Sequence, residues 1–117
     1  MALGSRLPVL LYRPQLIAEV RGKSVTADAD IFDNDLRAPD DGYWIIRVKT
    51  DTPGYPKVKE TKEGLAVYEI GALNEGADLS TNSWYEFWLV AHSCDLINVQ
   101  FSVAAKVTVR VFFVRMT

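Results

Sequence analysis

The strongest constraint on the fold is a regular alternation of apolar and polar residues in the last third of the chain. In the run 106–115, the residues Val109, Val111 and Phe113 share one side of an extended segment. Successive side chains of a β-strand point to opposite faces of a sheet, so this pattern indicates a strand with one buried face. No stretch of the sequence keeps the 3.6-residue apolar repeat of an amphipathic helix for more than one helical turn. The alternation therefore predicts an all-β fold without a helix.

Seven or eight strands are predicted, separated by turns rich in Gly, Pro, Asn and Asp. The candidate segments are residues 15–20, 23–32, 43–50, 57–61, 65–70, 84–91, 96–103 and 107–116. The segment 57–61 is expected to be a weak and exposed strand, whereas Trp44 is expected to point into the core. Short strands at this spacing are typical of an antiparallel two-sheet β-sandwich, either jelly-roll or immunoglobulin-like.

The length and composition fit one domain preceded by an arm. A chain of 117 residues, 49% of them apolar, can bury a core of its own. Residues 1–14 contain Gly4, Pro8 and Pro14, which interrupt any long strand ladder. We therefore predict an N-terminal arm at 1–14, within which residues 7–12 suit a short edge strand, and a single β-sandwich domain at 15–117.

The charges are unevenly placed along the chain. The formal net charge of −2 disfavours general nucleic-acid binding, which depends on a basic surface. Residues 1–23 carry Arg6, Arg13 and two further basic residues against one acid, and residues 28–41 carry six Asp against one Arg. This asymmetry suits contacts between an arm and a neighbouring chain, with Arg6 and Arg13 as candidate partner contacts. The same distribution also fits solvated loops.

The sequence shows no feature of secretion or of a membrane protein. The single cysteine, Cys94, cannot form an internal disulfide, so the fold does not depend on an oxidising compartment. No signal peptide is apparent, and no stretch approaches the roughly 20 apolar residues of a membrane helix. We expect a chain that is made and kept in a reducing cytosol, or assembled there into something larger, without a membrane partner.

The sequence contains no recognisable catalytic motif. The only histidine, His92, is followed directly by Ser93 and Cys94. Adjacent side chains of an extended segment point to opposite faces, so these residues cannot easily pair as base and nucleophile. The segment 92–95 is instead predicted to be a turn between two strands. No acid lies in a clearly apolar segment that would raise its pKa for glycoside chemistry. We therefore predict that the protein is not an enzyme and has no cofactor.

An acidic loop at 33–42 offers hard oxygen ligands and contains Pro39 and the turn signal Asp41-Gly42. The EF-hand pattern is missing, because Phe32 stands where that pattern needs an oxygen ligand. We predict no metal site. An irregular calcium site in the loop stays an open alternative, and its candidate ligands are Asp33, Asp35, Asp40 and Asp41.

The segment 84–91 has aromatic residues on both faces. Its purely apolar face, expected to face the core, consists of Tyr85, Phe87, Leu89 and Ala91. The opposite face carries Trp84, Glu86 and Trp88. Two outward aromatics that flank a carboxylate suit stacking on a sugar or anchoring a protein partner, which makes these three residues candidate contacts. The alternative is that a loop or the arm covers them within the same chain.

The last strand is also apolar on both faces, since Phe112 and Val114 lie opposite its core-facing residues. This pattern predicts that an arm or another subunit covers a second surface of the domain. We therefore predict a non-enzymatic structural protein that acts through protein contacts, such as a virion accessory (capsid decoration or cement) protein. It would be a homo-oligomer located in the virion or in the cytoplasm of the host cell. The alternative is a carbohydrate-binding or adhesin-like module that uses its exposed aromatics.

Overall fold

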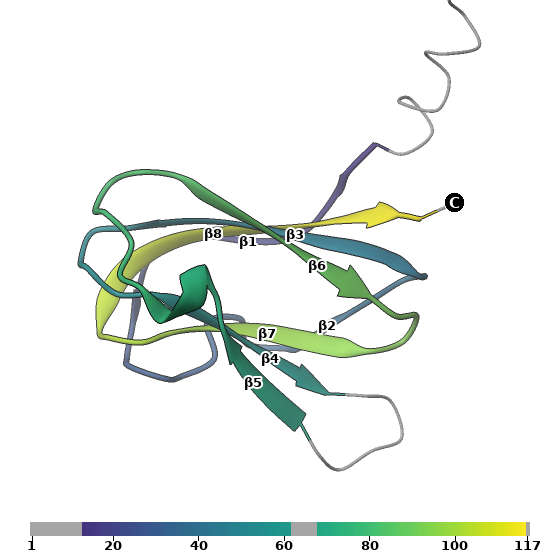
Figure 1. The fold of residues 1–117 in the computed structure, drawn as a ribbon, viewed down its shortest axis with the longest axis horizontal. Coiled ribbons are helices and arrows are strands. Elements are labelled where there is room, and N and C mark those ends of the chain that lie inside the picture. Colours follow the sequence, from purple (N-terminus) through teal and green to yellow (C-terminus); the bar gives the residue numbers. More distant parts are fainter. Residues whose placement is uncertain (1–12, 62–67, 117) are drawn as a thin grey trace, which may run out of the picture.

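The structure, a computed structural model, describes residues 13–61 and 68–116, which form two antiparallel four-stranded sheets stacked face to face (Figure 1). The strands are β1 (Gln15–Val25), β2 (Leu36–Arg37), β3 (Gly42–Thr50), β4 (Pro56–Thr61), β5 (Tyr68–Ala72), β6 (Tyr85–Ala91), β7 (Leu96–Phe101) and β8 (Ala105–Arg115). A short 3-10 turn, η1 (Asn74–Gly76), follows β5. Sheet A has the strand order β1-β8-β3-β6, and sheet B has the order β2-β7-β4-β5. The predicted all-β, two-sheet sandwich is therefore confirmed.

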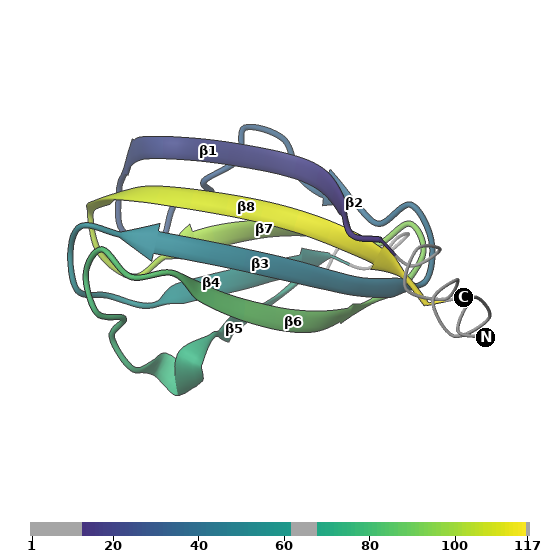
Figure 2. The ribbon, with the colours of Figure 1, turned by 90° about the horizontal axis from the view of Figure 1, so that it is seen from above.

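Almost every connection carries the chain from one sheet to the other. Within the described residues, only β4 and β5 are neighbours both in sequence and in a sheet. In sheet A, β3 pairs with β6 on one side and with β8 on the other along continuous registers. Figure 2 looks onto sheet A and shows β1 and β6 as its two edges. Residues that are far apart in sequence thus lie side by side on the outer face of this sheet.

The core lies between the two sheets and is built from the alternating residues that the sequence indicates. Its main side chains are Trp44, Ile46, Val48, Val107, Val109, Val111 and Phe113 from sheet A, and Val58, Ile97, Val99 and Phe101 from sheet B. Trp44 points inward as predicted and meets Phe113 edge to face, with ring centroids 5.7 Å apart. Full burial of one large apolar side chain stabilises the fold by roughly 1.5–3 kcal/mol, so this alternation supplies the main driving force.

The predicted strand at 23–32 is wrong. β1 continues through Gly22 to Val25, because a register shift between Val20 and Lys23 and the positive φ of Gly22 (56°) absorb the extra residues as a bulge. The chain then leaves the sheet. Asp28 has a left-handed φ of 61°, and within 26–35 only Asp30 makes an isolated bridge, to Gln100. Residues 28–31 run along the edge of β7 as a loop.

The predicted strand at 57–61 is confirmed, but the expectation that it is weak and exposed is wrong. This segment is β4, which lies inside sheet B between β7 and β5. Its Lys57 and Lys59 side chains form ion pairs with Asp28 and Asp30 of the loop, the second pair at 2.7 Å. The polar appearance of the strand therefore reflects partners that are 29 residues away in sequence.

Smaller differences concern the ends of elements. β2 lies inside the predicted acidic loop, Trp84 lies just before β6, and β8 begins at Ala105 and ends before Met116. Residues 65–67 of the predicted strand 65–70, and the edge strand at 7–12, lie outside the described residues. In the described part, no helix is long and apolar enough to cross a membrane.

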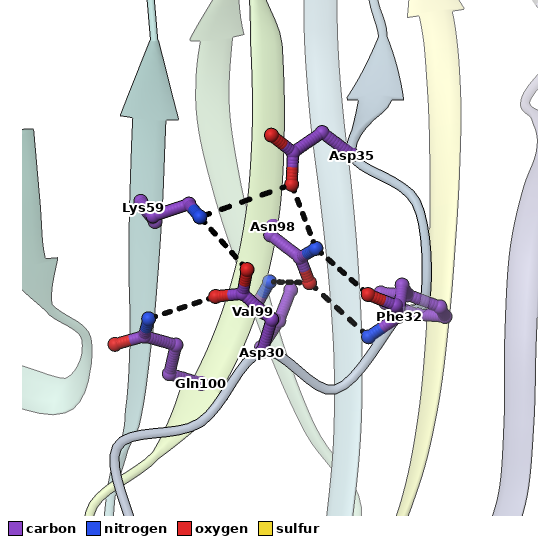
Figure 3. Close-up of polar contacts among 7 residues, drawn as sticks. All are labelled: Asp30, Phe32, Asp35, Lys59, Asn98, Val99 and Gln100. Atoms are coloured by element: carbon purple, nitrogen blue, oxygen red, sulfur yellow. Dashed lines mark hydrogen bonds and ion pairs between the residues drawn. The ribbon is translucent and has the colours of Figure 1, made fainter. Parts of the chain in front are cut away.

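A buried polar network ties the loop 26–35 to β7 (Figure 3). Asn98 is 1% exposed, and its Oδ1 accepts hydrogen bonds from the backbone N–H groups of Phe32 (3.2 Å) and Val99 (2.9 Å). Its Nδ2 donates to the Phe32 carbonyl and to Asp35 Oδ1, both at 2.9 Å. One side chain therefore satisfies three backbone groups and a carboxylate, which fixes the position of the loop.

Asp30 is the second anchor of this loop. Its carboxylate accepts hydrogen bonds from Gln100 Nε2 (2.8 Å) and from Lys59 Nζ (2.7 Å). Partial burial alone raises the pKa of Asp30, but the hydrogen bonds from Gln100 and Lys59 and the charge of Lys59 outweigh it. The resulting pKa lies below the usual value of an aspartate.

We expect Asp30→Asn to destabilise the fold at neutral pH and to matter less in acid. Because folding lowers the Asp30 pKa, the ionised carboxylate stabilises the fold above the unfolded-state pKa of about 3.9. That contribution is lost as the pH falls through the lower folded-state pKa. Urea unfolding of both proteins at about pH 7 and about pH 3 measures the difference in stability. A difference that stays constant between the two conditions would contradict the prediction.

Candidate protein-interaction surface

The outer face of sheet A carries an apolar cluster, which we call the outer-face patch. The strand registers set Leu16, Phe112, Ile45 and Trp88 in one row across all four strands, and Val114, Tyr43 and Val90 in the row beside it. These seven residues are the outward members of strands whose alternate residues fill the core. The patch is therefore a direct product of the apolar residues found on both faces of β3, β6 and β8.

Much of the outer-face patch is open to solvent. Trp88 is 55% exposed, Val90 53% and Leu16 50%, whereas Ile45 at the centre is only 4% exposed. The rings of Trp88 and Tyr43 pack against each other at a tilt, with centroids 6.1 Å apart. Contiguous large apolar side chains are uncommon on the surface of a monomeric protein and mark sites of contact with another molecule.

A charged row borders the outer-face patch. It consists of Glu19, Arg110, Arg47 and Glu86, one residue from each strand of sheet A. Glu19 lies between Arg21 (2.7 Å) and Arg110 (2.6 Å). The hydrogen bond from Arg21 lowers the pKa of Glu19, partial burial opposes this, and the hydrogen bond from Arg110 lowers the pKa further. Glu19 therefore remains ionised at neutral pH and balances the arginines beside it.

At the other end of the row, Glu86 accepts a hydrogen bond from Trp88 Nε1 (2.9 Å) and lies 3.5 Å from Arg47 Nε. Arg47 Nε is buried and makes no hydrogen bond among the described residues. Both carboxylates of the row thus lie close to arginines, so the row adds little net charge to the surface.

Trp84, Glu86 and Trp88 all lie on the outer face, but in different surroundings. Trp84 is 40% exposed, and its ring lies close to three cations, with Arg110 at 4.9 Å, Lys49 at 5.4 Å and Arg47 at 5.7 Å from the ring centroid. Such cation–π contacts hold the ring against its own sheet. Trp88, which packs on Tyr43, is the more exposed of the two tryptophans.

The two candidate arginines of the arm do not join this group. Arg13 lies at the end of the sandwich, where it lines a hollow of about 170 Å³ together with Arg115. Arg6 lies outside the described residues.

Pro14 does approach the patch. Together with Ile45, Phe112, Arg47 and Glu86, it lines a hollow of about 190 Å³ at the border between the apolar and charged rows.

The remaining candidates have ordinary structural roles. Residues 92–95 form the predicted turn between β6 and β7, closed by a hydrogen bond from Asp95 N to the His92 carbonyl. The acidic residues of the loop are used separately: Asp35 binds Asn98, Asp41 accepts from Ser93 N, and Asp40 pairs with Arg115. Within residues 13–61 and 68–116, no group of three His, Cys, Asp or Glu side chains is placed to hold a metal ion.

The sequence reasoning missed several residues of the patch. Tyr43 and Ile45 lie on the same face of β3 as Arg47, and Leu16 lies on β1 beside Phe112. A signal was present, because the apolar Ile45 stands on the otherwise polar face of its strand. The contact between this position and Trp88 depends on the pairing of β3 with β6, which the sequence does not state.

Comparisons with known proteins match the fold of this chain rather than its sequence. No family model matches the chain, and no curated protein matches it significantly. Among solved structures, the chain is similar to the C-terminal domain of A223, a structural protein from sulfolobus turreted icosahedral virus, with a TM-score of 0.55 and 13% sequence identity. The match covers 89% of this chain and 100% of that one. At this level of identity the likeness shows the fold alone, so this chain has a fold that a viral structural protein also uses.

Proposed function

We propose that this chain is a non-enzymatic structural protein of a virion, an accessory protein of the decoration or cement type that acts through contacts with other proteins. The observation that carries the proposal is the outer-face patch, with Trp88, Val90 and Leu16 each at least half exposed. A partner that covers this patch would bury an apolar centre bordered on one side by the charged row, and protein interfaces combine an apolar core with a polar rim. The function then depends on surface complementarity rather than on chemistry.

The fold supports the same proposal at a coarser level. The strand orders β1-β8-β3-β6 and β2-β7-β4-β5 match the two interleaved sheets of an eight-stranded jelly roll, an architecture that is frequent in viral capsid proteins and in lectins. The solved domain with a similar fold also belongs to a viral structural protein. Because a fold hosts many functions, this argument ranks below the surface itself.

Within the proposal, the arm at 1–14 extends the contact surface. Arg6 and Arg13 give it positive charge, and its apolar residues suit pairing with a neighbouring chain. The partners would be further copies of the chain and a larger assembly such as a capsid, with the protein located in the virion or in the cytoplasm of the infected cell.

The carbohydrate-binding alternative is less well supported by the geometry. A sugar platform needs free aromatic faces and free polar groups beside them. The Trp84 ring already lies among Arg110, Lys49 and Arg47, and the Glu86 carboxylate is held by Trp88 and Arg47. The groups that would bind a sugar are therefore engaged within the chain, which favours a protein partner.

The test is incorporation into purified particles of the virus whose genome encodes the chain. We expect the protein to sediment with the particles at a fixed ratio to the main capsid protein. The variant Leu16→Glu, which puts a charge on the patch, should lose most of this incorporation, whereas Ser24→Glu should keep it. Both positions are exposed on β1, but Ser24 lies outside the patch. Finding the unaltered protein only in the unassembled fraction would refute the proposal.

A further inference from the structure

The four sheet edges of the sandwich differ in how well they are protected. Natural sheets block free edges with short strands, bulges and charged residues, because an open edge pairs with other chains. β2 has only two residues, and β5 has five, one of them Gly71. β1 is long, but it has two register shifts and carries Glu19, Arg21 and Lys23. β2 and β5 are therefore shorter than β6, and β1 is bulged and charged.

The fourth edge strand, β6, is neither short nor bulged and carries a single charged residue. It is seven residues long, pairs with β3 without a register shift, and contains no Pro, Gly, Lys or Arg. Its single charge, Glu86, is already held by Arg47 and Trp88. Figure 2 shows β6 as the free margin of sheet A. A regular and largely apolar edge of this kind favours pairing with another strand.

The space beneath β6 is also incompletely filled and partly apolar. The inward side chains Phe87 and Leu89 pack on the core but are only half buried. Leu89 lies at a hollow of about 230 Å³ between β6 and the edge of sheet B, whose other lining residues are Val58, Glu60, Ile70, Gly71, Ala72 and Leu73. A strand added to β6 would shield Leu89 and this hollow from water, in addition to satisfying the backbone groups at the edge.

We propose that β6 pairs in antiparallel fashion with β6 of a second copy of this chain, across a two-fold axis, so that the two copies of sheet A form one continuous sheet. This inference rests on the proposed function, since it names one of the contacts through which the protein would assemble. Among the described strands, a head-to-tail contact between two sandwiches would need a second open edge, and β2 and β5 are shorter than β6, while β1 is bulged and charged. A closed dimer formed by one edge with itself is therefore the arrangement that the chain favours.

Pairing over the full length of β6 fixes the register. Trp88 then faces Trp88 of the partner subunit at the axis, Phe87 faces the partner's Leu89, and Val90 faces the partner's Glu86. No two like charges lie opposite each other, and the central pair is aromatic, which is a favourable cross-strand combination. The pairing also brings the two outer-face patches together into one wider surface.

Sedimentation velocity over a range of concentrations tests the inference. The unaltered protein should pass from its monomer mass of 13.1 kDa toward twice that mass as its concentration rises. Val90→Glu would set two pairs of glutamates opposite each other and should raise the dimer Kd about tenfold or more. Val90→Lys places a lysine opposite each Glu86 and should leave the Kd within about threefold of its original value. Trp88→Lys sets like charges at the axis and should abolish the dimer.

Leu16→Glu is the matched control, because Leu16 is an exposed residue of the same face on the opposite edge of sheet A. It should leave the dimer Kd unchanged, and an unchanged far-ultraviolet circular dichroism spectrum would show that each variant is folded. A monomer at every concentration would overturn the inference, as would equal weakening by Val90→Glu and Val90→Lys, or weakening by Leu16→Glu. Loss of the dimer on deletion of residues 1–12, with the β6 variants unaffected, would also overturn it and assign the contact to the arm. None of these results would refute the proposed function, which is tested by incorporation into particles.

Discussion

Replacing Asn98 with alanine is expected to lower the free energy of unfolding by about 3 kcal/mol. The side chain is 1% exposed, so water cannot take over its hydrogen bonds. Alanine would leave the N–H and the carbonyl of Phe32 without their partner, and each buried polar group left unpaired costs about 1–3 kcal/mol. Urea unfolding followed by tryptophan fluorescence measures the change.

Two further variants distinguish the effect of losing the hydrogen bonds of Asn98 from the effect of losing side-chain volume. Asn98→Asp keeps the shape of the side chain but replaces the Nδ2 donor to the Phe32 carbonyl and Asp35 with an oxygen. At neutral pH it should therefore lower the free energy of unfolding at least as much as alanine does. Asn34→Ala, at an exposed position in the same loop, should stay within about 0.5 kcal/mol of the original stability. A loss below about 1 kcal/mol for Asn98→Ala would contradict the role assigned to this side chain.

The loop that Asn98 holds also covers a sheet edge. Residues 28–31 lie along β7, where Asp28 N and Ile31 N donate to the carbonyls of Phe101 and Val99. The loop therefore covers a sheet edge that β2 alone is too short to cover. In the proposed dimer, release of this loop would expose the edge of β7 in addition to that of β6, so chains could associate without forming a closed dimer.

The sequence predicts the strands of sheet A and β7 well, because each alternates around a face that the core needs. β3 and β8 carry buried residues at every second position, as the pattern indicates. At 23–32 the alternation wrongly predicts a strand, because small and acidic residues also alternate there although the chain turns at Asp28. The sequence also wrongly predicts an exposed strand at 57–61, where the lysines are satisfied by loop carboxylates from another part of the chain.

The candidate site likewise combines features that the sequence predicts with features that depend on the tertiary structure. The outward position of Trp84, Glu86 and Trp88 follows from alternation within one strand, so the sequence predicts it. The patch as a whole depends on which strands are neighbours, since Ile45, Phe112 and Trp88 meet only through the order β8-β3-β6. Strand order is set by packing of the entire sandwich, and a single sequence carries no local signal for it.

Replacing Gly42 with alanine is expected to destabilise the protein by about 2–3 kcal/mol. The Asp41-Gly42 pair is a turn signal in the sequence, yet Gly42 is the first residue of β3 and is buried. A Cβ atom there would lie 2.9 Å from Phe113 Cζ and closer still to the carbonyl oxygen of Val114. Glycine is required because the backbone of β8 passes too close for any side chain. Phe113 also packs on Trp44, so a displaced ring would disturb the centre of the core.

Gly71→Ala is the matched control for this prediction, and chemical unfolding of both variants measures the difference. Gly71 lies in the edge strand β5, where a Cβ atom would meet nothing within 4 Å. Alanine there should leave the stability unchanged or raise it by up to about 1 kcal/mol, because it restricts the unfolded chain without creating a clash. If Gly42→Ala proved as harmless as Gly71→Ala, the close approach of β8 to β3 would not constrain this residue. A large loss confined to Gly42→Ala would show that the junction of these two central strands, which also positions Tyr43 and Val114 in the outer-face patch, admits only glycine.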